Sequence, residues 1–371
     1  MQGYLIASDD PAWDRTLARI RHDFYHLPDY VALSARRQEP GTPVAFIAEE
    51  GERAFLLPLI LREIPPAIAG GEGWGDATSG RHYPGPIAGP DEGASTGEFV
   101  AGALDELVAT LRAEGVVSAF VRLHPLLSPP FDALQRIGDV VEHGDAVSID
   151  LDKSVEQLWS ETRQTHRHEI NKGYRNGYRV RIDPTWERFD DFLVLHRQTM
   201  DRLEAAPHWR LGIDDFLDLR ATLGDRLHLC VVERDDELAA AILLVEEDGI
   251  IDYHVSATAP AHIAASPTKL SIDFARRWAK ERGARVLHLG GSLARDDSLI
   301  QWKLGFSRDL WPVASWRVVV RPDAYDELVR RRDALAGTSG KPDSGFFPRY
   351  REPIAPAAPT SEAGNDADDD A

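Results

Sequence analysis

The order of the helices and strands expected between residues 154 and 320 constrains the fold more than any other feature of the chain. Hydrophobic periodicity predicts a helix, a strand and two further helices, over 154–172, 178–182, 186–204 and 213–223. Three strand-like runs in meander order come next. They are followed by a helix, a strand, a short helix and a last strand, over 267–282, 285–291, 298–305 and 314–320. This succession predicts a mixed sheet flanked by helices, an α/β architecture.

The first 150 residues repeat this plan in a weaker form. Helices are expected over 10–21, 28–38 and 97–114, and strands over 44–50, 53–64, 116–123 and 145–151. A glycine- and proline-rich loop runs from Pro65 to Pro90 and contains the segments GGEGWGDATSG and RHYPGP. A loop of this length suggests a function. With about 150 residues per domain as a guide, a chain of 371 residues is expected to form two domains.

The element order matches the acyltransferase fold usually called GNAT. We therefore predict two GNAT-like domains of the acyl-CoA N-acyltransferase type, each a central mixed sheet flanked by helices, over 1–150 and 151–321, with a cleft between them. The helix at 322–336 is expected to pack toward the first domain. Residues 337–371 read as a mostly disordered acidic tail, although the segment FFPRYR at 346–351 is aromatic enough to dock.

Composition excludes several classes of protein. The formal charge of −19 argues against a protein that coats nucleic acid. Cys230 is the only cysteine, which rules out an internal disulfide framework or a cysteine-based zinc site. No apolar run is long enough to span a membrane, so we expect no stable membrane insertion. The first residues lack the pattern of a signal peptide, and we expect a cytoplasmic protein.

A basic segment from 163 to 181 is a local exception in this acidic chain. Six bases face a single acid, Glu169, and Arg163 and Arg167 are one helical turn apart; the bases are Arg163, Arg167, Lys172, Arg175, Arg179 and Arg181. The segment fits two interpretations. It could bind the phosphates of tRNA or of a nucleotide-linked acceptor, or it could be a solvated face that pairs with the acidic remainder.

The most specific motif comes near the end of the second half. It combines a glycine pair, a short gap, Asp-Asp-Ser-Leu, an aromatic residue, a lysine and, three residues later, a phenylalanine. The positions are Gly290, Gly291, Asp296, Asp297, Ser298, Leu299, Trp302, Lys303 and Phe306. Together with RNGYRVRI, LHRQTMDRLEA and IIDYHVSATAP, this motif resembles the FemABX family of aminoacyl-tRNA-dependent peptidyltransferases. The resemblance covers about residues 154–336, and Trp302 stands where the family usually has phenylalanine.

The resemblance implies a transfer reaction and a set of site residues. The family moves an aminoacyl group from tRNA to an amine, commonly on a peptidoglycan precursor, and related proteins serve in small-molecule pathways. Lys303 matches the lysine that neutralises charge during transfer, Arg202 an arginine that contacts substrate phosphates, and Tyr253 a tyrosine of the acceptor groove. Trp302 would keep the aromatic wall. Arg163, Arg167, Lys172 and Arg175 are further candidates for substrate binding.

Other interpretations stay open from the residues alone. Lys303 could be a solvated surface lysine, Arg202 could pair with a neighbouring acid, and Asp296 and Asp297 fit either a general base or a helix cap. The segment TAPAHIAASP lacks the Q/R-x-x-G-x-G/A turn that cradles the pyrophosphate of coenzyme A. We therefore expect no cofactor and no metal, with aminoacyl-tRNA as donor and a small-molecule or peptide amine as acceptor.

The main alternative is an N-acyltransferase that uses acyl-CoA or an acyl carrier. A non-catalytic ligand-binding member is the second. Two departures from the family pattern bear on the acceptor: Val31 follows Tyr30 where a lysine is usual, and Ala119 or Phe120 stands where a tyrosine is expected. The sequence leaves the amino acid, the acceptor and the oligomeric state open.

Overall fold

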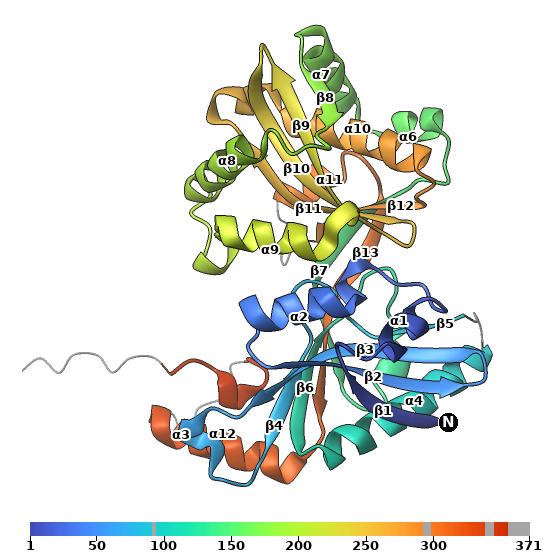
Figure 1. Cartoon of the computed structure of the whole chain (residues 1–371), viewed down its shortest axis with the longest axis vertical. Coiled ribbons are helices and arrows are strands. Elements are labelled where there is room, and N and C mark those ends of the chain that lie inside the picture. The colour runs from blue at the N-terminus through green and yellow to red at the C-terminus, as the bar shows by residue number, and fades with distance from the viewer. Residues whose placement is uncertain (91–93, 292–297, 338–344, 355–371) are drawn as a thin grey trace, which may run out of the picture.

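The computed structural model describes residues 1–90, 94–291, 298–337 and 345–354. The chain forms two lobes joined by two long strands, β7 (Asp139–Asp150) and β13 (Asp309–Val319), which run from one lobe into the other (Figure 1). Among the described residues no helix has the length and apolarity that spanning a bilayer requires.

The first lobe combines six strands with helices on both sheet faces. Its elements are β1 (Gln2–Ala7), α1 (Ala12–Leu17), α2 (Pro28–Arg37), β2 (Thr42–Glu50), β3 (Arg53–Glu63), α3 (Pro66–Ala69), β4 (Gly75–Thr78), β5 (Ile87–Gly89), α4 (Ala94–Ala113), β6 (Val116–Arg122), α5 (Phe131–Leu134) and α12 (Pro322–Ala336). Alternation along β2 explains the layers. Phe46 packs in the core beneath α4, whereas Ile47 packs with α1 and α2 on the other face.

The second lobe carries the elements expected from the sequence pattern. They are α6 (Val155–Glu161), α7 (Gln164–Arg175), β8 (Arg179–Ile182), α8 (Phe189–Arg202), α9 (Ile213–Leu223), β9 (Leu227–Arg234), β10 (Glu237–Glu247), β11 (Ile250–Thr258), α10 (Pro267–Glu281), β12 (Val286–Gly291) and α11 (Ser298–Lys303). The parallel pair β11–β12 and the antiparallel meander β9–β10–β11 make its sheet mixed. The predicted class, a mixed sheet flanked by helices in each half, is confirmed.

The expectation of two separate sheets is wrong. Hydrogen bonding is continuous through 13 strands, in the order β1-β2-β3-β4-β6-β13-β7-β12-β11-β10-β9-β8, with β5 beside β3. The cause lies in β13, which begins earlier than expected. Residues Asp309–Arg317 of β13 pair with β7, from Ser148 back to Asp139, and Ser315–Val319 pair with β6 on the other side. The last strand of the expected second domain therefore completes the first lobe's sheet.

The single helix expected over 154–172 is also wrong, because it breaks at Thr162. Ser154 and Gln157 form a capping box at the start of α6, and Thr162 ends that helix with an extended backbone, ψ 129°. Arg276 stabilises the break by donating to the carbonyl of Leu158 and to the hydroxyl of Thr162, at 3.0 and 2.8 Å. The chain restarts as α7 at Gln164.

The end of the chain packs on the first lobe. Leu328 of α12 lies in a core cluster with Ile64, Ile68 and Val117. Beyond α12, Tyr350 is buried and its hydroxyl contacts Ser118 and Asp76, so the segment 345–354 is docked rather than free. The expectation of a disordered tail otherwise concerns 338–344 and 355–371, which lie outside the described residues.

Candidate active site

The site is built where two parallel strands of the second lobe part. β11 and β12 pair only over Ile250–Asp252 and Val286–His288, and a bulge in β11 follows, opposite Leu243 and Leu244. Asp252 and His288 are the last partners before the strands separate. Because they are direct neighbours in register, their side chains leave the sheet on the same face.

Lys303 lies beside this opening, at the end of β12. It is the last residue of α11, it is 5% exposed, and its Nζ donates to the carbonyl of Gly291 at 3.1 Å. Gly290, the residue before Gly291 in β12, has φ +75°, a conformation that side chains disfavour, and so the end of this strand requires glycine. The predicted lysine is therefore a buried cation held at the end of β12, not a solvated one.

Four polar atoms around the opening are buried without a hydrogen-bond partner in the described part of the chain. They are Asp252 Oδ2, His254 Nδ1 and both ring nitrogens of His288. Burial lowers the pKa of His288 to about 4; the Asp252 carboxylate opposes this shift, and Lys303 adds to it. Buried polar atoms are usually satisfied, and a cluster of exceptions points to a functional position.

The first lobe contributes a second set of polar groups to the same place. The hydroxyl of Tyr83 accepts a hydrogen bond from the amide of Gly291 at 3.0 Å, and its ring lies 5.5 Å from that of His288. His124, 6.2 Å from His288 between ring centroids, is hydrogen-bonded to Asp23 at 2.9 Å. Burial raises the pKa of Asp23 to about 7 and lowers that of His124 to about 3.

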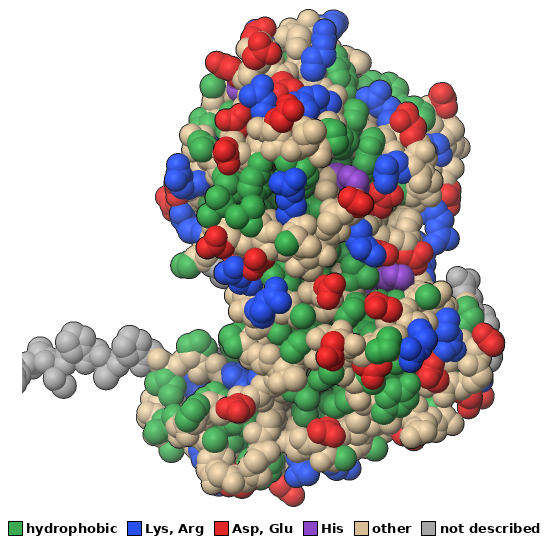
Figure 2. Space-filling model, viewed as in Figure 1, with side chains coloured by type: hydrophobic (Ala, Val, Ile, Leu, Met, Phe, Trp, Pro, Cys, Tyr) green, Lys and Arg blue, Asp and Glu red, His purple; other side chains and the backbone are tan. Residues whose placement is uncertain are grey.

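Two cavities lie beside these groups at the junction of the lobes. The larger, of about 860 Å³, is lined by both lobes and borders Gly291 and Tyr83; its other lining residues are Glu39, Arg81, His82, Phe120, Arg122, His143, Trp209, Leu299, Val313, Ala314 and Ser315. The second, of about 420 Å³, lies between α2, α8 and β11 and shares Arg81, His82, Trp209 and Leu299 with the first. On the face in Figure 2, acidic and basic side chains are intermixed over both lobes, so this face as a whole carries no charge signal for a ligand.

The residues named from the family pattern are only partly brought together. Trp302 packs against Phe306 and His166, 5.5 and 6.3 Å away between ring centroids, and so supports α11 from within the second lobe. Arg202 is exposed at the end of α8 and contacts the carbonyl of Thr258 at 3.4 Å. Tyr253 is half-buried in the core beneath α10, and burial raises its pKa to about 12. Among the described lining residues of the two junction cavities, neither Arg202 nor Tyr253 occurs.

The basic segment spreads along α7 instead of forming one site. The amide of Arg163 donates to the carbonyl of Gly305 at 2.7 Å, which places the start of α7 beside the turn after Lys303. Arg167 is half-buried and reaches carbonyls at the end of α6. Lys172 and Arg175 are exposed at the far end, some three turns along. Arg181 is paired with Asp183 and Glu233.

Sequence reasoning missed most of the buried polar cluster. Asp252, His288, His124 and Asp23 come from four distant segments, and no local spacing links them. The loop containing Tyr83 was singled out by its glycine and proline content, but without a role. Asp296 and Asp297 lie outside the described residues. No group of three or more metal-ligating side chains occurs among the residues that the structure describes.

Comparison with known proteins identifies the fold. Residues 160–304 match the model described as the acetyltransferase (GNAT) domain. No curated protein matches the chain. The crystal structure of FemX is similar over 88% of this chain and 99% of that one, with a TM-score of 0.68 and 12% identity. The expected resemblance is therefore confirmed at the level of the fold.

Two further structures share this fold more distantly. L-PGS from Bacillus licheniformis covers 88% of this chain and 97% of its own, with a TM-score of 0.51 and 14% identity. The C-terminal domain of a putative lysylphosphatidylglycerol synthetase from Agrobacterium fabrum gives the same TM-score and identity, over 88% and 96%. At these identities the similarity shows a shared fold and does not identify the substrates of this chain.

Proposed function

We propose that this protein is a Fem-like acyltransferase that forms an amide between an activated aminoacyl group and an amine. One observation carries the proposal: the ammonium of Lys303 is buried against Gly291, at the edge of a cavity lined by both lobes. A buried cation beside a cavity suits a reaction in which negative charge develops there. The fold shared with FemX supports the same reading.

In this reaction Lys303 would stabilise the negative charge that develops on oxygen. The amine nitrogen attacks the carbonyl carbon of the aminoacyl ester, and the carbonyl oxygen becomes an oxyanion. As the tetrahedral intermediate collapses, the carbon–oxygen bond to the leaving alcohol breaks and the amide remains. A fixed ammonium in a site shielded from water stabilises the oxyanion or the leaving oxygen without reorganisation.

Asp252 and His288 are proposed to take the proton that the amine releases. Burial keeps the His288 ring neutral at neutral pH, the form that accepts a proton. The carboxylate of Asp252 is its strand partner and stabilises the protonated ring. From there the proton passes to the leaving oxygen, so that the step needs no other reactant.

The donor is proposed to be aminoacyl-tRNA. The segment Pro260–Ala265 before α10 is a 3₁₀ turn, and Pro267 at the start of α10 has no amide proton to offer a phosphate. Lys269, in the first turn of α10, forms an ion pair with Glu169. This arrangement disfavours a coenzyme A pyrophosphate at the helix start, whereas exposed bases on α7 suit an RNA backbone.

The acceptor is proposed to be an amine on a small molecule or a peptide, such as a peptidoglycan precursor or a specialised metabolite. Ala119 or Phe120 stands where the family pattern has a tyrosine, and Phe120 lines the 860 Å³ cavity, where its ring makes the wall less polar. This less polar wall favours the specialised metabolite over the usual nucleotide-linked muropeptide.

A donor-exchange assay tests the proposal. The purified protein is given a mixture of amines with either aminoacyl-tRNA or acyl-CoA, and new amides are detected by mass spectrometry. Amide formation from aminoacyl-tRNA alone is the expected result. Amide formation from acyl-CoA alone would show that acyl-CoA, not aminoacyl-tRNA, is the donor. The absence of product with either donor across a broad set of amines would contradict the assignment.

A further inference from the structure

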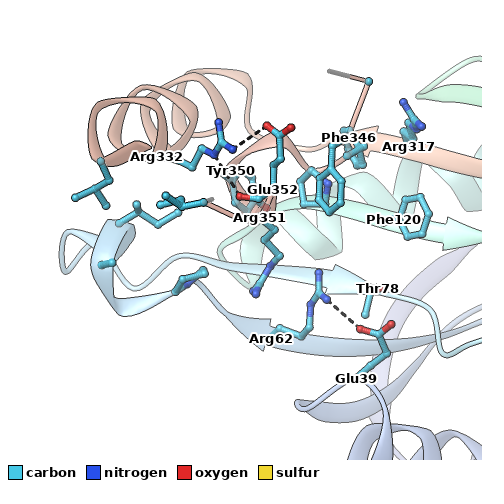
Figure 3. Close-up of a pocket in the computed structure, with 18 of the residues that line it drawn as sticks. Glu39, Arg62, Thr78, Phe120, Arg317, Arg332, Phe346, Tyr350, Arg351 and Glu352 are labelled. Carbon is cyan, nitrogen blue, oxygen red and sulfur yellow. Dashed lines mark hydrogen bonds and ion pairs between the residues drawn. The ribbon is translucent and has the colours of Figure 1, made fainter. Parts of the chain in front are cut away.

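A third cavity lies over the first lobe's sheet, away from Lys303. It measures about 680 Å³ and is walled by β3, β6 and β13 on one side and by α12 with the segment 345–354 on the other (Figure 3). The residues that matter for its chemistry are Glu39, Arg62, Phe120, Arg122, Arg317, Arg332, Phe346, Phe347, Arg351 and Glu352.

The wall carries more positive than negative charge in a chain whose net charge is −19. Six arginines contribute to the cavity and its supporting ion pairs: Arg62, Arg122, Arg317, Arg332, Arg349 and Arg351. Their acidic partners are four: Glu39, Asp76, Asp333 and Glu352. The local balance is two positive charges, which matches a dianion.

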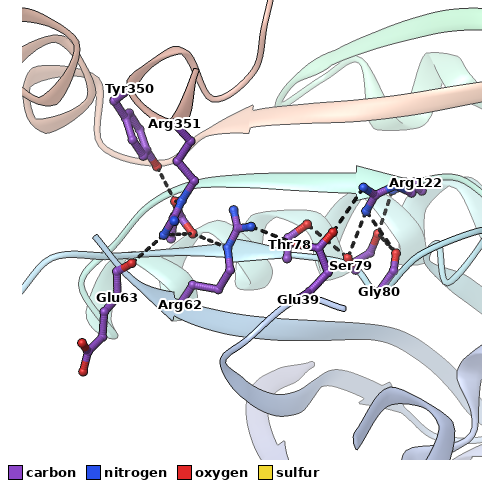
Figure 4. A network of polar contacts seen from close by, with 10 residues as sticks. Glu39, Arg62, Glu63, Thr78, Ser79, Gly80, Arg122, Tyr350 and Arg351 are labelled. Atoms are coloured by element: carbon purple, nitrogen blue, oxygen red, sulfur yellow. Dashed lines mark hydrogen bonds and ion pairs between the residues drawn. The ribbon is translucent and has the colours of Figure 1, made fainter. Parts of the chain in front are cut away.

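The ion pairs fix these arginines in place. The buried carboxylate of Asp76 accepts hydrogen bonds from Arg62 at 2.9 Å, from Arg351 and from the hydroxyl of Tyr350. Figure 4 shows these three partners pointing toward one another. Arg122 donates to the carbonyls of Ser79 and Gly80 at 3.2 and 3.1 Å. Donors already held by the protein lose little freedom on binding a ligand, so the site is preorganised.

Arg317 has a buried donor that is available to a ligand. Its Nε is buried without a hydrogen-bond partner among the described residues, and its guanidinium lies 5.8 Å from the ring centre of Phe347. A guanidinium presents two parallel donors to a phosphate. In Figure 3, Arg317, Phe120 and Phe346 gather at one end of the cavity.

Aromatic side chains cover this end. The rings of Phe120 and Phe347 are 6.4 Å apart between centroids, and Phe346 is 43% exposed at the rim. Such faces stack on flat apolar groups. This end lies next to the junction, because this cavity and the 860 Å³ cavity share the lining residues Glu39, Phe120, Arg122 and His143.

We propose that this cavity binds a phosphate monoester whose ester group is flat and apolar. The phosphate is held by Arg317 with Arg122, and the flat group rests on Phe120, Phe346 and Phe347. Lys303 is not among the described lining residues of this cavity, although Phe120 and Arg122 also border the 860 Å³ cavity, and the inference holds whether or not the protein transfers acyl groups. Because the two cavities are adjacent, the site also offers an anchor for one end of a longer substrate.

Isothermal titration calorimetry with phenyl phosphate, inorganic phosphate and phenol in a phosphate-free buffer tests the proposal. Phenyl phosphate should bind more tightly than either of the other two, and its affinity should fall as salt rises. Arg317→Gln should weaken it about tenfold or more, because a charged hydrogen-bond donor is removed. Arg330→Gln, on the exposed side of α12, is the matched control and should bind as the wild type does.

A second variant separates the two halves of the site. Phe346→Ala at the rim should weaken phenyl phosphate but leave inorganic phosphate unchanged, and it decides the question if Arg317→Gln fails to fold. Lys303→Met should bind phenyl phosphate normally, which keeps this proposal separate from the catalytic one. Absence of binding at millimolar phenyl phosphate, or equal affinity in Arg317→Gln and the wild type, would overturn the inference.

Discussion

The hydroxyl of Tyr83 accepts a hydrogen bond from the amide of Gly291 at 3.0 Å, and this contact links the first lobe to the end of β12 in the second. The carbonyl of the same glycine holds the ammonium of Lys303. The two backbone polar groups of Gly291 therefore both contact the candidate site: the amide contacts Tyr83 of the first lobe, and the carbonyl contacts Lys303 of the second.

Tyr83→Phe removes the acceptor and leaves the part-buried Gly291 amide without it. We expect a loss of about 0.5–1.5 kcal/mol in the free energy of unfolding, together with a lower turnover, because Gly291 also positions Lys303. Tyr4→Phe is the matched control: it removes the hydrogen bond to Glu49 at 3.0 Å, far from the site, and should leave turnover unchanged. Equal turnover in Tyr83→Phe and the wild type would show that the hydrogen bond is only structural.

Gly305→Ala should destabilise the turn after Lys303. An added Cβ would overlap the ring of His166, whose Nε2 contacts the carbonyl of Trp302 at 3.0 Å. Overpacking of this kind typically costs about 1–3 kcal/mol. By contrast, Gly97→Ala at an exposed position of α4 meets no neighbour and should stabilise by up to about 1 kcal/mol. Urea unfolding of both variants measures the difference, and equal stabilities would contradict the packing at Gly305.

Stability should fall as the pH drops from about 6.5 to 4. Burial lowers the pKa of His124 to about 3 and that of His288 to about 4, so over this range the unfolded chain binds protons that the folded chain does not. The pKa of His26 and of His82 is also lowered well below normal. The pKa of Asp23 is raised to about 7, so this group binds a proton in the folded chain that the unfolded chain does not bind. Its effect on stability therefore has the opposite sign and offsets the effect of one of these histidines.

Unfolding at pH 5 and at pH 7 measures this dependence. His288→Gln should lose less stability on acidification than the wild type, by up to about 1.4 kcal/mol per pH unit. An unchanged slope in the variant would show that His288 is not held neutral in the folded state.

The fold could be predicted further than the site. The order of elements in the second half follows from hydrophobic periodicity, which is a local signal, and α10 begins at the predicted Pro267. The break at Thr162 is stabilised by Arg276, 114 residues away, and the two halves form one sheet because β13 pairs with β6. Such long-range contacts leave no local pattern.

The same limit applies to the candidate site. Lys303 stood out because a contiguous motif surrounds it. Asp252 and His288 become partners only through the parallel register of two strands, and Tyr83 reaches them from the other lobe. A buried histidine and a surface histidine look alike in a sequence. Burial and pairing, which decide their chemistry, belong to the folded chain.

Exposed bases at both ends of α7 should contribute to RNA binding. The double variant Arg163→Glu with Lys172→Glu should weaken tRNA binding and lower the slope of log affinity against log salt, by roughly 0.9 for each phosphate that the protein no longer neutralises. Filter binding over a range of salt concentrations measures both quantities. Arg330→Glu is the control. Identical slopes for the double variant and the wild type would make α7 a solvated face.

Turnover of Lys303→Met, measured together with donor affinity and stability, tests the central claim most directly. Methionine keeps the apolar stem and removes the charge, so turnover should fall by about 10²–10³ while donor affinity changes little. Lys303→Arg should restore only part of the rate, because the planar fork cannot occupy the same point. Near-normal turnover in a folded Lys303→Met protein would contradict the account.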